Sequence, residues 1–541
     1  MFFYDWRKKI NDITEDLNSY LQQIVIPNHP NSKIDLAGHS LGGLVARIYG
    51  QKHGKDSINK IITAGSPHLG TAGTYKLVEA GEIEKQDSIL WLMQELAFQI
   101  NRKGFKTNKE TINSVMPVAK DLFPVYDFLI DKEGNNISIQ SMKIKNTTLL
   151  HYSSGFSQLF SALTTLAGDK DKNTLSGHKV DKRTSLDILL ENYPDGRPIE
   201  NRFGLGDGVI VLNSAEAGND RTVFPNDHGE IIYKALSIKT ILDKLGIPYS
   251  PNQIVEGKAT KITPSLIFAL LSPAEMQVDF NTQQYFEQEG LIFIENAQAG
   301  DYKLKIKGKF PGGQYTILSG QISDTDDRWF EIRGEINTLL PFLQTDTYTI
   351  TFDTESLLDY PVNQDDILSL FDLLIQRLTL IKKELANFSQ SESIEESIEE
   401  LKEAKRNFQN NHFKEMRKNL LESHEEIFGA RKKAKTFYMN ELYDTLIQFE
   451  NLYERSLEKA NLTPTHPSLE NKLRRLNKNY DSNENWLLQK KQKGVDVTNQ
   501  AVLLGLAGEK LTKASDSLNE QKLNLAEILL ESAQRLLRKI R

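Results

Sequence analysis

The sequence predicts a multidomain protein with a parallel, doubly wound α/β sheet domain, then an antiparallel β-sandwich, then an all-α helical region. Its length of 541 residues exceeds the roughly 100–200 residues of one domain. Short apolar runs alternate with helical patterns up to Gly246, and a two-residue alternation follows; glycine and proline then become scarce after residue 361. We therefore expect domains at residues 1–246, 251–355 and 362–541.

Three apolar, β-branched runs are the predicted strands of the first domain, at residues 33–37, 58–64 and 147–151. Each is followed by a helical pattern or by a long insertion. Strands that alternate with helices in this way form parallel sheets, because the helix returns the chain to the edge at which the previous strand began.

Alternating apolar and polar residues mark the predicted strands of the second domain, at residues 301–307, 314–318 and 347–352. A Pro-Gly-Gly segment at 311–313 supplies a turn between two of them. A period of two is typical of a strand that buries one face. We therefore expect an Ig-like sandwich over residues 251–355.

The third domain has few turn-forming residues: only four of the 33 glycines and two of the 17 prolines lie beyond residue 361. Apolar residues from Ile367 to Ile381 recur every three to four positions, as on one helix face. Residues 391–400 have the serine–glutamate pattern of a capping box. We expect a bundle or stalk of long helices.

Two tetrapeptides of this helical region recur along the chain. L-K-E-A and L-L-E-S are echoed by L-T-K-A and a second L-L-E-S, which begin at Leu401, Leu420, Leu511 and Leu529. The echo indicates either a repeated helical hairpin or two unrelated helices of similar composition.

Composition excludes several classes of protein. The net charge of −7, from 66 basic and 73 acidic residues, argues against nucleic-acid binding through phosphate contacts. Without cysteine there is no disulfide, thiolate metal site or cysteine nucleophile. No apolar run approaches the roughly 18 residues that span a bilayer, and charged residues from Asp5 onward rule out a signal peptide at Met1. We predict no metal and no cofactor.

Ser40 is the predicted nucleophile. It lies in Gly38-His39-Ser40-Leu41-Gly42, a G-x-S-x-G pattern between a predicted strand and a predicted helix. Gly38 and Gly42 permit a sharp turn in which larger side chains would clash, so the serine hydroxyl is exposed above free N–H groups of the helix. The alternative is a purely structural turn.

His228 is the predicted general base and Asp207 the acid that orients it. His228 lies in a polar turn after an apolar run, and Asp207 lies between Gly206 and Gly208. The order Ser, Asp, His is the one this kind of fold requires. A helix-capping histidine and an ordinary Asp-Gly turn are the structural alternatives, and the weaker acid candidates are Asp227 and Asp195.

Five blocks of sequence resemble a known family in the same order. They are F-F-Y-D-W-R, G-H-S-L-G-G, A-G-S-P-H-L-G-T, G-D-G-V-I-V-L-N-S-A and H-G-E, which begin at Phe2, Gly38, Ala64, Gly206 and His228. Together they resemble the lecithin:cholesterol acyltransferase-like lipases, and more loosely the GPI inositol-deacylases, of the α/β-hydrolase superfamily. The resemblance covers residues 1–246.

The resemblance implies a Ser40–Asp207–His228 triad and acyl-ester chemistry on a lipid or other ester. It also implies a lid inserted at about residues 72–142. The apolar stretches of this lid, 89–93 and 122–129, either cover an acyl pocket or pack a small core of their own.

One departure from the family concerns the oxyanion hole. In the family, Y-D-W-R marks the fourth strand, and a glycine-bearing loop after the third strand gives one of two oxyanion donors. The Leu41 N–H can be the other, so the second donor is missing from this chain. We therefore expect an N-terminally truncated sheet, from the C-terminal portion of a longer reading frame.

Three functions follow as predictions. The first is a serine esterase or lipase. The second is an inert hydrolase fragment whose sandwich and helices act in surface binding or adhesion. The third is an acyltransferase or amide hydrolase on the same triad. Sandwich modules beside a hydrolase are typical of exported bacterial proteins. By that analogy we expect membrane-surface or cell-surface contact, and an extracellular or cell-envelope location if an upstream segment exists.

Overall fold

The computed structural model divides into two compact units. One consists of residues 1–83 and 107–260, and the other of 84–106 and 261–541. The described residues are 1–540 without 31, 55, 86–87, 103–106, 259–261, 272–273, 339–340, 355–356, 358–366, 386–389, 434–444, 447, 450–451, 454–455, 458–459 and 461–468.

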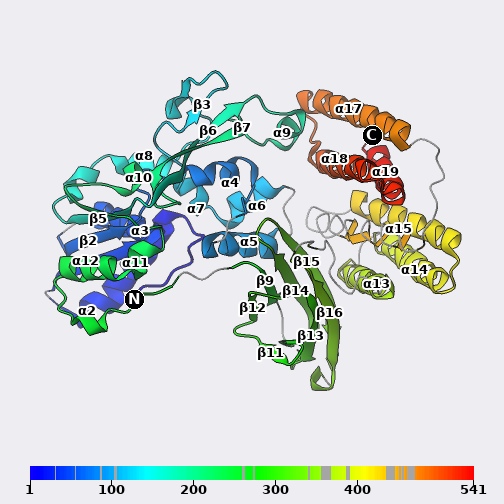
Figure 1. Cartoon of the computed structure of the whole chain (residues 1–541), viewed down its shortest axis with the longest axis horizontal. Coiled ribbons are helices and arrows are strands. Elements are labelled where there is room, and N and C mark those ends of the chain that lie inside the picture. The colour runs from blue at the N-terminus through cyan, green and yellow to red at the C-terminus, as the bar shows by residue number, and fades with distance from the viewer. Residues whose placement is uncertain are drawn as a thin grey trace. The chain divides into compact units, whose positions relative to one another are not determined.

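The first unit contains a four-stranded parallel sheet (Figure 1). Its strands, in spatial order, are β1 (Ile34–His39), β2 (Ile58–Ala64), β5 (Leu163–Gly168) and β8 (Asp220–Phe224). The strands predicted at residues 33–37 and 58–64 are therefore confirmed. The strands lie side by side in the same order as along the chain. Each neighbouring pair is parallel.

Helices cover both faces of this sheet, because neighbouring residues of a strand point to opposite sides. Ile61 packs with α1 (Ile10–Tyr20) and α3 (Leu41–His53). Its neighbour Ile62 packs with α11 (Glu230–Tyr233) and α12 (Ala235–Leu245). The doubly wound α/β architecture is thus confirmed.

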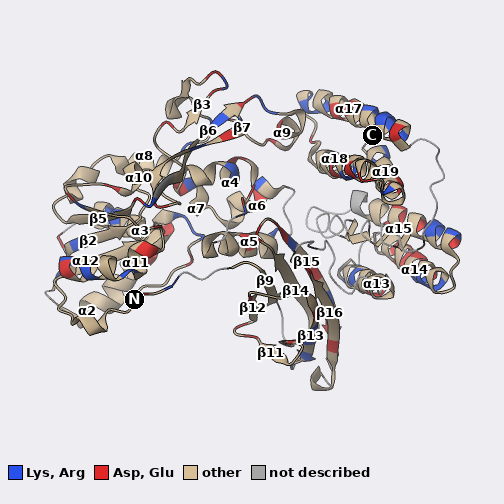
Figure 2. Cartoon of the chain, in the orientation of Figure 1, with Lys and Arg blue, Asp and Glu red and all other residues tan. Residues whose placement is uncertain are grey.

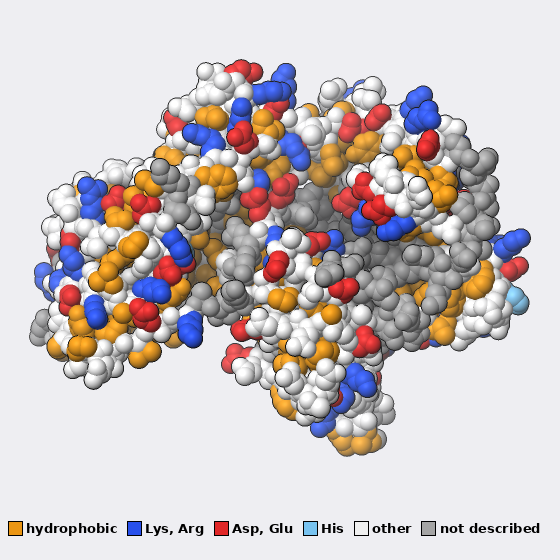
Figure 3. All heavy atoms as spheres, in the orientation of Figure 1, with side chains coloured by type: hydrophobic (Ala, Val, Ile, Leu, Met, Phe, Trp, Pro, Cys, Tyr) orange, Lys and Arg blue, Asp and Glu red, His pale blue; other side chains and the backbone are white. Residues whose placement is uncertain are grey.

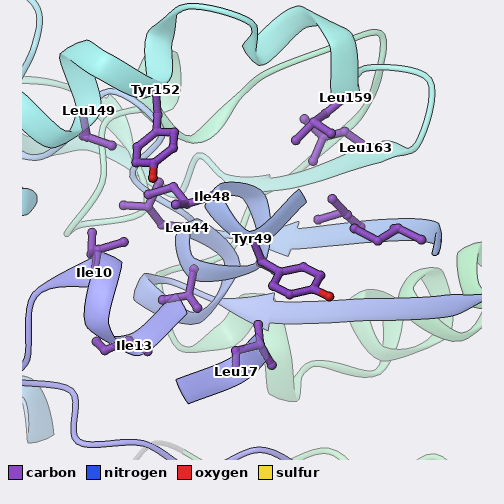
Figure 4. Packing of buried hydrophobic residues seen from close by; sticks show 14 of the residues in the cluster. Ile10, Ile13, Leu17, Leu44, Ile48, Tyr49, Leu149, Tyr152, Leu159 and Leu163 are labelled. Carbon is purple, nitrogen blue, oxygen red and sulfur yellow. The ribbon is translucent and has the colours of Figure 1, made fainter. Parts of the chain in front are cut away.

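The larger core of this unit lies between α1, α3 and the sheet. Figure 4 shows Ile10, Ile13 and Leu17 of α1 facing Leu44 and Ile48 of α3. None of these five side chains is more than 6% exposed. Burial of a leucine or isoleucine side chain contributes about 1.5–3 kcal/mol, so this contact anchors the helix that follows Ser40.

One predicted strand is wrong. Residues 147–151 form part of a helix, α8 (Thr147–Ser153). The Asn146 side chain accepts a hydrogen bond from the Leu149 N–H at 2.8 Å. This N-cap starts a helix despite the β-branched threonines, since it satisfies an N–H group that a helix start leaves free. The third strand of the sheet is β5 instead.

Two insertions interrupt the sheet of the first unit. The first, between β2 and β5, contains α4 (Tyr75–Ala80), α6 (Asn108–Val115), α7 (Val118–Asp121), β3 (Leu129–Ile130), β4 (Asn136–Ile137) and then α8. The second, between β5 and β8, contains β6 (Asp171–Asp181), α9 (Ser185–Leu190), β7 (Arg197–Gly206) and α10 (Leu212–Ala215). Their strands form one sheet in the order β4-β3-β6-β7. The β6–β7 pair was not predicted from the sequence.

The predicted lid stretch at residues 122–129 packs a core of its own. Tyr75, Phe123 and Phe128 are no more than 1% exposed, and their ring centroids lie 5.5–6.0 Å apart. The other stretch begins α5 (Ile89–Asn101), which belongs to the second compact unit. On α5, Trp91 is buried, whereas Ile89 is 55% exposed.

A buried acid in the first insertion makes stability depend on pH. Burial, together with the negative charge of Asp195, raises the pKa of Glu79 to about 8. Between the ordinary pKa of glutamate and pH 8, the folded protein holds a proton that the unfolded chain has released. The free energy of unfolding should therefore fall over this range, by at most about 1.4 kcal/mol per pH unit.

We expect Glu79→Gln to flatten this dependence, since an amide does not ionise. Thermal unfolding midpoints at pH 5, 6.5 and 8 would measure it in both proteins. Equal slopes for the two proteins would show that Glu79 is not the titrating group.

Besides α5, the second unit contains two four-stranded antiparallel sheets, which form the predicted antiparallel sandwich. One has the order β11-β10-β13-β16 and the other β12-β9-β14-β15. The strands are β9 (Ser265–Leu270), β10 (Ala274–Phe280), β11 (Gln283–Phe286), β12 (Leu291–Glu295), β13 (Gly300–Gly308), β14 (Gly313–Ile322), β15 (Asp327–Ile336) and β16 (Thr345–Phe352). The three strands predicted from alternation are β13, β14 and β16. Their burial also alternates, with Tyr302, Leu304 and Ile306 buried on β13.

Long helices follow, as the scarcity of glycine and proline predicted. They include α13 (Ile367–Glu384), α14 (Gln390–Gln409), α15 (Phe413–Lys433), α17 (Leu469–Gln492), α18 (Thr498–Asn519) and α19 (Leu523–Arg538). Residues 391–400 lie inside α14, so this stretch is helical, but it does not precede the helix as a capping box would. The predicted start of this region at residue 362 lies outside the described residues.

Two helical hairpins, α14–α15 and α18–α19, turn in the same way. Asn411 and Gln521 both have positive φ, 57° and 60°. In the first turn the His412 N–H donates to the Asn407 carbonyl, and in the second the Lys522 N–H donates to the Ser517 carbonyl. Both hydrogen bonds are 2.8 Å long. The equivalent geometry favours a repeated hairpin over a chance echo.

Acidic and basic residues are interspersed along the helices of the helical region (Figure 2). The face shown in Figure 3 likewise mixes acidic and basic groups. This follows from the near balance of 66 basic and 73 acidic residues. Among the described residues, no helix is both long and apolar enough to cross a membrane.

Candidate active site

The carboxyl ends of the four parallel strands meet at one edge of the sheet. The Ser40 N–H donates to the Ala64 carbonyl at the end of β2, and the Gly65 N–H donates to the Leu166 carbonyl on β5, each over 2.8 Å. The Asp169 N–H donates to the Phe224 carbonyl at the end of β8, also over 2.8 Å. Ligands of open parallel sheets bind at this edge.

Ser40 occupies a strained turn between β1 and α3. Its φ of 51° and ψ of −123° lie in a region that few residues other than glycine adopt. Such a conformation is typical of a nucleophile elbow, which lifts the serine hydroxyl above the sheet edge.

Glycines make this turn feasible. A Cβ atom on Gly38 would lie 2.4 Å from the Gly42 carbonyl carbon, and one on Gly43 would lie 2.0 Å from Ser66 Oγ. A Cβ on Gly42 would meet only the Tyr4 hydroxyl, at 3.4 Å. The prediction that Gly38 is sterically required is therefore right and that for Gly42 is wrong. Gly43 is the second crowded position, because it faces β2 across the turn.

Replacing Gly38 by alanine should distort the elbow, since the clash is with backbone atoms that cannot rotate away. We expect a loss of at least about 10²-fold in kcat/KM and about 1–3 kcal/mol of unfolding free energy. Gly42→Ala is the matched control, with a loss below about tenfold. Ester hydrolysis and thermal unfolding of both variants measure this, and equal losses would contradict it.

Asp207 and His228 are in direct contact. His228 Nδ1 lies 2.8 Å from Asp207 Oδ2, and the His228 N–H donates to the Asp207 carbonyl, also at 2.8 Å. The Asp207 side chain is fully buried and that of His228 is 15% exposed. The other carboxylate oxygen accepts the N–H groups of Val209 and Ile210, at 3.0 and 2.7 Å. Asp207 is thus both a turn residue and a partner of His228.

Two further glycines leave space for this pair. A Cβ on Gly65 would lie 3.1 Å from both Asp207 Oδ2 and His228 Nδ1. A Cβ on Gly168 would lie 2.7 Å from the Asp207 Cβ. Sequence reasoning did not assign either glycine to the site, although Gly65 belongs to the A-G-S-P-H-L-G-T block.

Leu41 is the first residue of α3. The Gly43 and Leu44 N–H groups both donate to the Ser40 carbonyl, at 3.2 and 3.3 Å. Helix geometry gives the Leu41 N–H no acceptor within the helix, so it is free to bind an anion beside Ser40. No hydrogen bond joins Ser40 Oγ to His228 among the residues described. Such contacts are often looser before substrate binds.

The weaker acid candidates bond elsewhere. Asp227 accepts the Glu230 N–H at 2.8 Å and forms an ion pair with Lys170 at 3.0 Å. Asp195 accepts the N–H groups of Lys143 and Ile144, at 2.6 and 2.9 Å. Each therefore holds backbone in place, and neither is bonded to His228.

His39 also touches His228, which the sequence did not predict. Its Nε2 lies 2.8 Å from the His228 carbonyl oxygen, and the ring centroids are 4.5 Å apart. Burial, reinforced by the neighbouring charge of His228, lowers the pKa of His39 to about 4. The two residues are 189 positions apart, so no local pattern could reveal the contact.

The described residues contain no group of three His, Asp or Glu side chains that could hold a metal ion. The arrangement can instead supply a hydroxyl nucleophile, an imidazole oriented by a carboxylate, and a free N–H at a helix start. These are the components of nucleophilic catalysis at a carbonyl carbon.

The parallel sheet with helices on both faces, and the serine turn at its carboxyl edge, define the class as a domain of α/β-hydrolase fold. Within that class, residues 8–78 match the family described as the PGAP1-like alpha/beta domain. This matched segment contains α1, β1, the Ser40 turn, α3 and β2. No curated protein matches the chain.

Solved structures with similarity to the chain include one complex, one lipase and one phospholipase. The Tle4–Tli4 complex has a TM-score of 0.26 at 15% identity, over 40% of this chain and 60% of that one. Lipase BlEst2 of Bacillus licheniformis, in its propeptide form, has a TM-score of 0.24 at 11% sequence identity, over 65% of this chain and 86% of that one. Phospholipase PlaB of Legionella pneumophila has a TM-score of 0.21 at 9% sequence identity, over 62% of this chain and 80% of that one. Because these TM-scores are below 0.5, the three structures do not support the class. It rests on the family match and on the fold.

Proposed function

We propose that this chain is a serine hydrolase that cleaves carboxylic esters, with lipid acyl esters as its substrates. The contact of 2.8 Å between Asp207 Oδ2 and His228 Nδ1 carries the proposal. It lies at the sheet edge where the strained turn places Ser40. A buried carboxylate that holds an imidazole at such an edge has a direct chemical use as the support of a general base.

In the proposed first step, Ser40 Oγ attacks the ester carbonyl carbon while His228 Nε2 takes the hydroxyl proton. The carbonyl π bond opens, and the oxyanion accepts a hydrogen bond from the Leu41 N–H. Asp207 accepts the Nδ1 hydrogen of His228 and stabilises the imidazolium. The ester C–O bond then breaks, and the alcohol leaves with the proton from His228.

In the second step, water gives a proton to His228 and attacks the acyl-enzyme, which releases the acid and restores Ser40. An alcohol in place of water would give a new ester, so hydrolysis and acyl transfer share one intermediate. The class supports ester cleavage in either case.

The preference for lipid esters is supported by the resemblance of the sequence blocks in residues 1–246 to lipases and by apolar surface on α5. Ile89, Leu90 and Met93 of this helix are 38–55% exposed. Exposed apolar groups of this kind suit contact with a membrane surface. Surface contact and an extracellular or cell-envelope location remain predictions.

Purified protein and p-nitrophenyl esters of increasing acyl length would test the proposal. We expect turnover that a fluorophosphonate abolishes, with higher kcat/KM for longer acyl chains up to an optimum. Added alcohol that yields a new ester would identify a transferase. A folded protein without turnover on any ester would contradict the proposal and favour the binding or adhesion function.

A further inference from the structure

His39 lies between the two parts of the candidate site. It is the last residue of β1, directly before Ser40, and its ring reaches the loop that carries His228. A carbonyl oxygen only accepts hydrogen bonds, so the 2.8 Å contact requires that His39 Nε2 carries the hydrogen and donates it. This bond fixes the tautomer of His39.

Three hydrogen bonds hold the backbone and ring of His228. Asp207 binds its ring at Nδ1 and accepts its N–H, and His39 donates to its carbonyl, each at 2.8 Å. The two bonds to Asp207 set the distance of His228 from the acid. Among the hydrogen bonds of the described residues, the one from His39 joins this loop to the end of β1, directly before Ser40.

We infer that His39 is a positioning residue, which holds His228 at the correct distance from Ser40 through its hydrogen bond to the His228 carbonyl. This inference rests on the proposed function and adds a residue outside the triad to it. A displacement of about 1 Å in a catalytic group can cost about 10²-fold in rate. The bond therefore has a catalytic effect although His39 touches no reacting atom.

The charge state of His39 suits this role. The groups that act on it electrostatically are His228 and Asp207. A pKa of about 4 keeps its ring neutral at the pH at which ester hydrolysis is assayed. A neutral neighbour, unlike a charged one, does not oppose the positive charge that His228 acquires during the reaction.

Two substitutions separate the hydrogen bond from the packing. His39→Gln keeps an amide donor close to the place of Nε2, whereas His39→Leu keeps the bulk and removes the donor. We expect His39→Leu to lower kcat on p-nitrophenyl esters by about 10- to 100-fold with little change in KM. His39→Gln should stay within a few-fold of the wild type. His53→Leu, at the far end of α3, is the control for loss of a histidine.

A measurement that needs no turnover makes the test independent of the proposed function. In a proton NMR spectrum, the proton on His228 Nδ1 should give a downfield resonance, because it is hydrogen-bonded to a buried carboxylate. We expect a sharp signal in the wild type and in His39→Gln. In His39→Leu we expect it to broaden through faster exchange with water, because the loop that carries His228 loses the hydrogen bond to its carbonyl. Thermal unfolding would establish that both variants are folded.

The outcomes are distinct. Full activity in His39→Leu, or an equal loss in folded His39→Gln, would overturn the positioning role. A wild type that shows no esterase activity would contradict the proposed function, and the resonance would then decide the positioning role alone. If the signal is unchanged in His39→Leu, the inference is wrong.

Discussion

Replacement of Ser40 by alanine is expected to abolish labelling by a fluorophosphonate and to lower kcat for ester hydrolysis by about 10⁶-fold. The probe reacts only with a serine whose proton a neighbouring base removes. Ser40 is the residue at the strained turn, with the Asp207–His228 pair at the same edge of the sheet. Fluorescence of the labelled band and initial rates on a p-nitrophenyl ester measure the two effects.

Ser66→Ala is the matched control for this experiment. Ser66 is a fully buried serine next to the turn, close to Gly43. Its loss should leave the labelling intact, since a buried hydroxyl is closed to the probe. Labelling that persists in Ser40→Ala would mean that another residue is the nucleophile.

Asp207→Asn should lower kcat by about 10⁴-fold with KM little changed. The amide oxygen can still accept the N–H groups of Val209 and Ile210 at the position of Oδ1, so the turn should remain folded. An NH₂ group would then face His228 Nδ1 in place of an acceptor. The imidazole would adopt the wrong tautomer, with the hydrogen on the nitrogen that must accept the serine proton.

Asp227→Asn provides the comparison, because Asp227 is one residue from His228 but caps α11 and pairs with Lys170. We expect its kcat within a few-fold of the wild type. Rates and unfolding midpoints of both variants give the answer. A larger loss of kcat in Asp227→Asn than in Asp207→Asn would show that Asp207 is not the acid that orients His228.

Much of the fold follows from local patterns. The run at residues 58–64 predicted β2, most of which is buried, as in an interior parallel strand. The run at residues 33–37 predicted β1, but this strand lies at the edge of the sheet and its residues alternate between partly buried and exposed. Alternation predicted β13 and β16, because period two places one face of a strand in a core. Scarce glycine and proline predicted the long helices from α13 onward.

The Ser40 turn was also predictable, since glycine, serine and the flanking strand and helix are all contiguous in the chain. The choice of Asp207 and His228 used chain order and the family resemblance. These arguments named the two residues, but they could not give the distance between them.

Other features depended on contacts between distant residues. Asn146 begins α8 where a strand was predicted. Its side chain caps the helix at the Leu149 N–H, and it is held in place by donating to the carbonyls of Asp121 and Phe123, 25 and 23 residues away. The β6–β7 pair closes over a long segment whose alternation is irregular, and its register shifts at several points. Such interruptions hide the period on which strand prediction depends.

The finer structure of the site likewise needed the folded chain. The crowding at Gly43, the space beside Gly65 and the bond from His39 to His228 each involve residues from different elements of the chain. A sequence pattern records which residues neighbour each other along the chain. Folding brings β1, β2, β5 and β8 side by side, and only then do their carboxyl ends become one site.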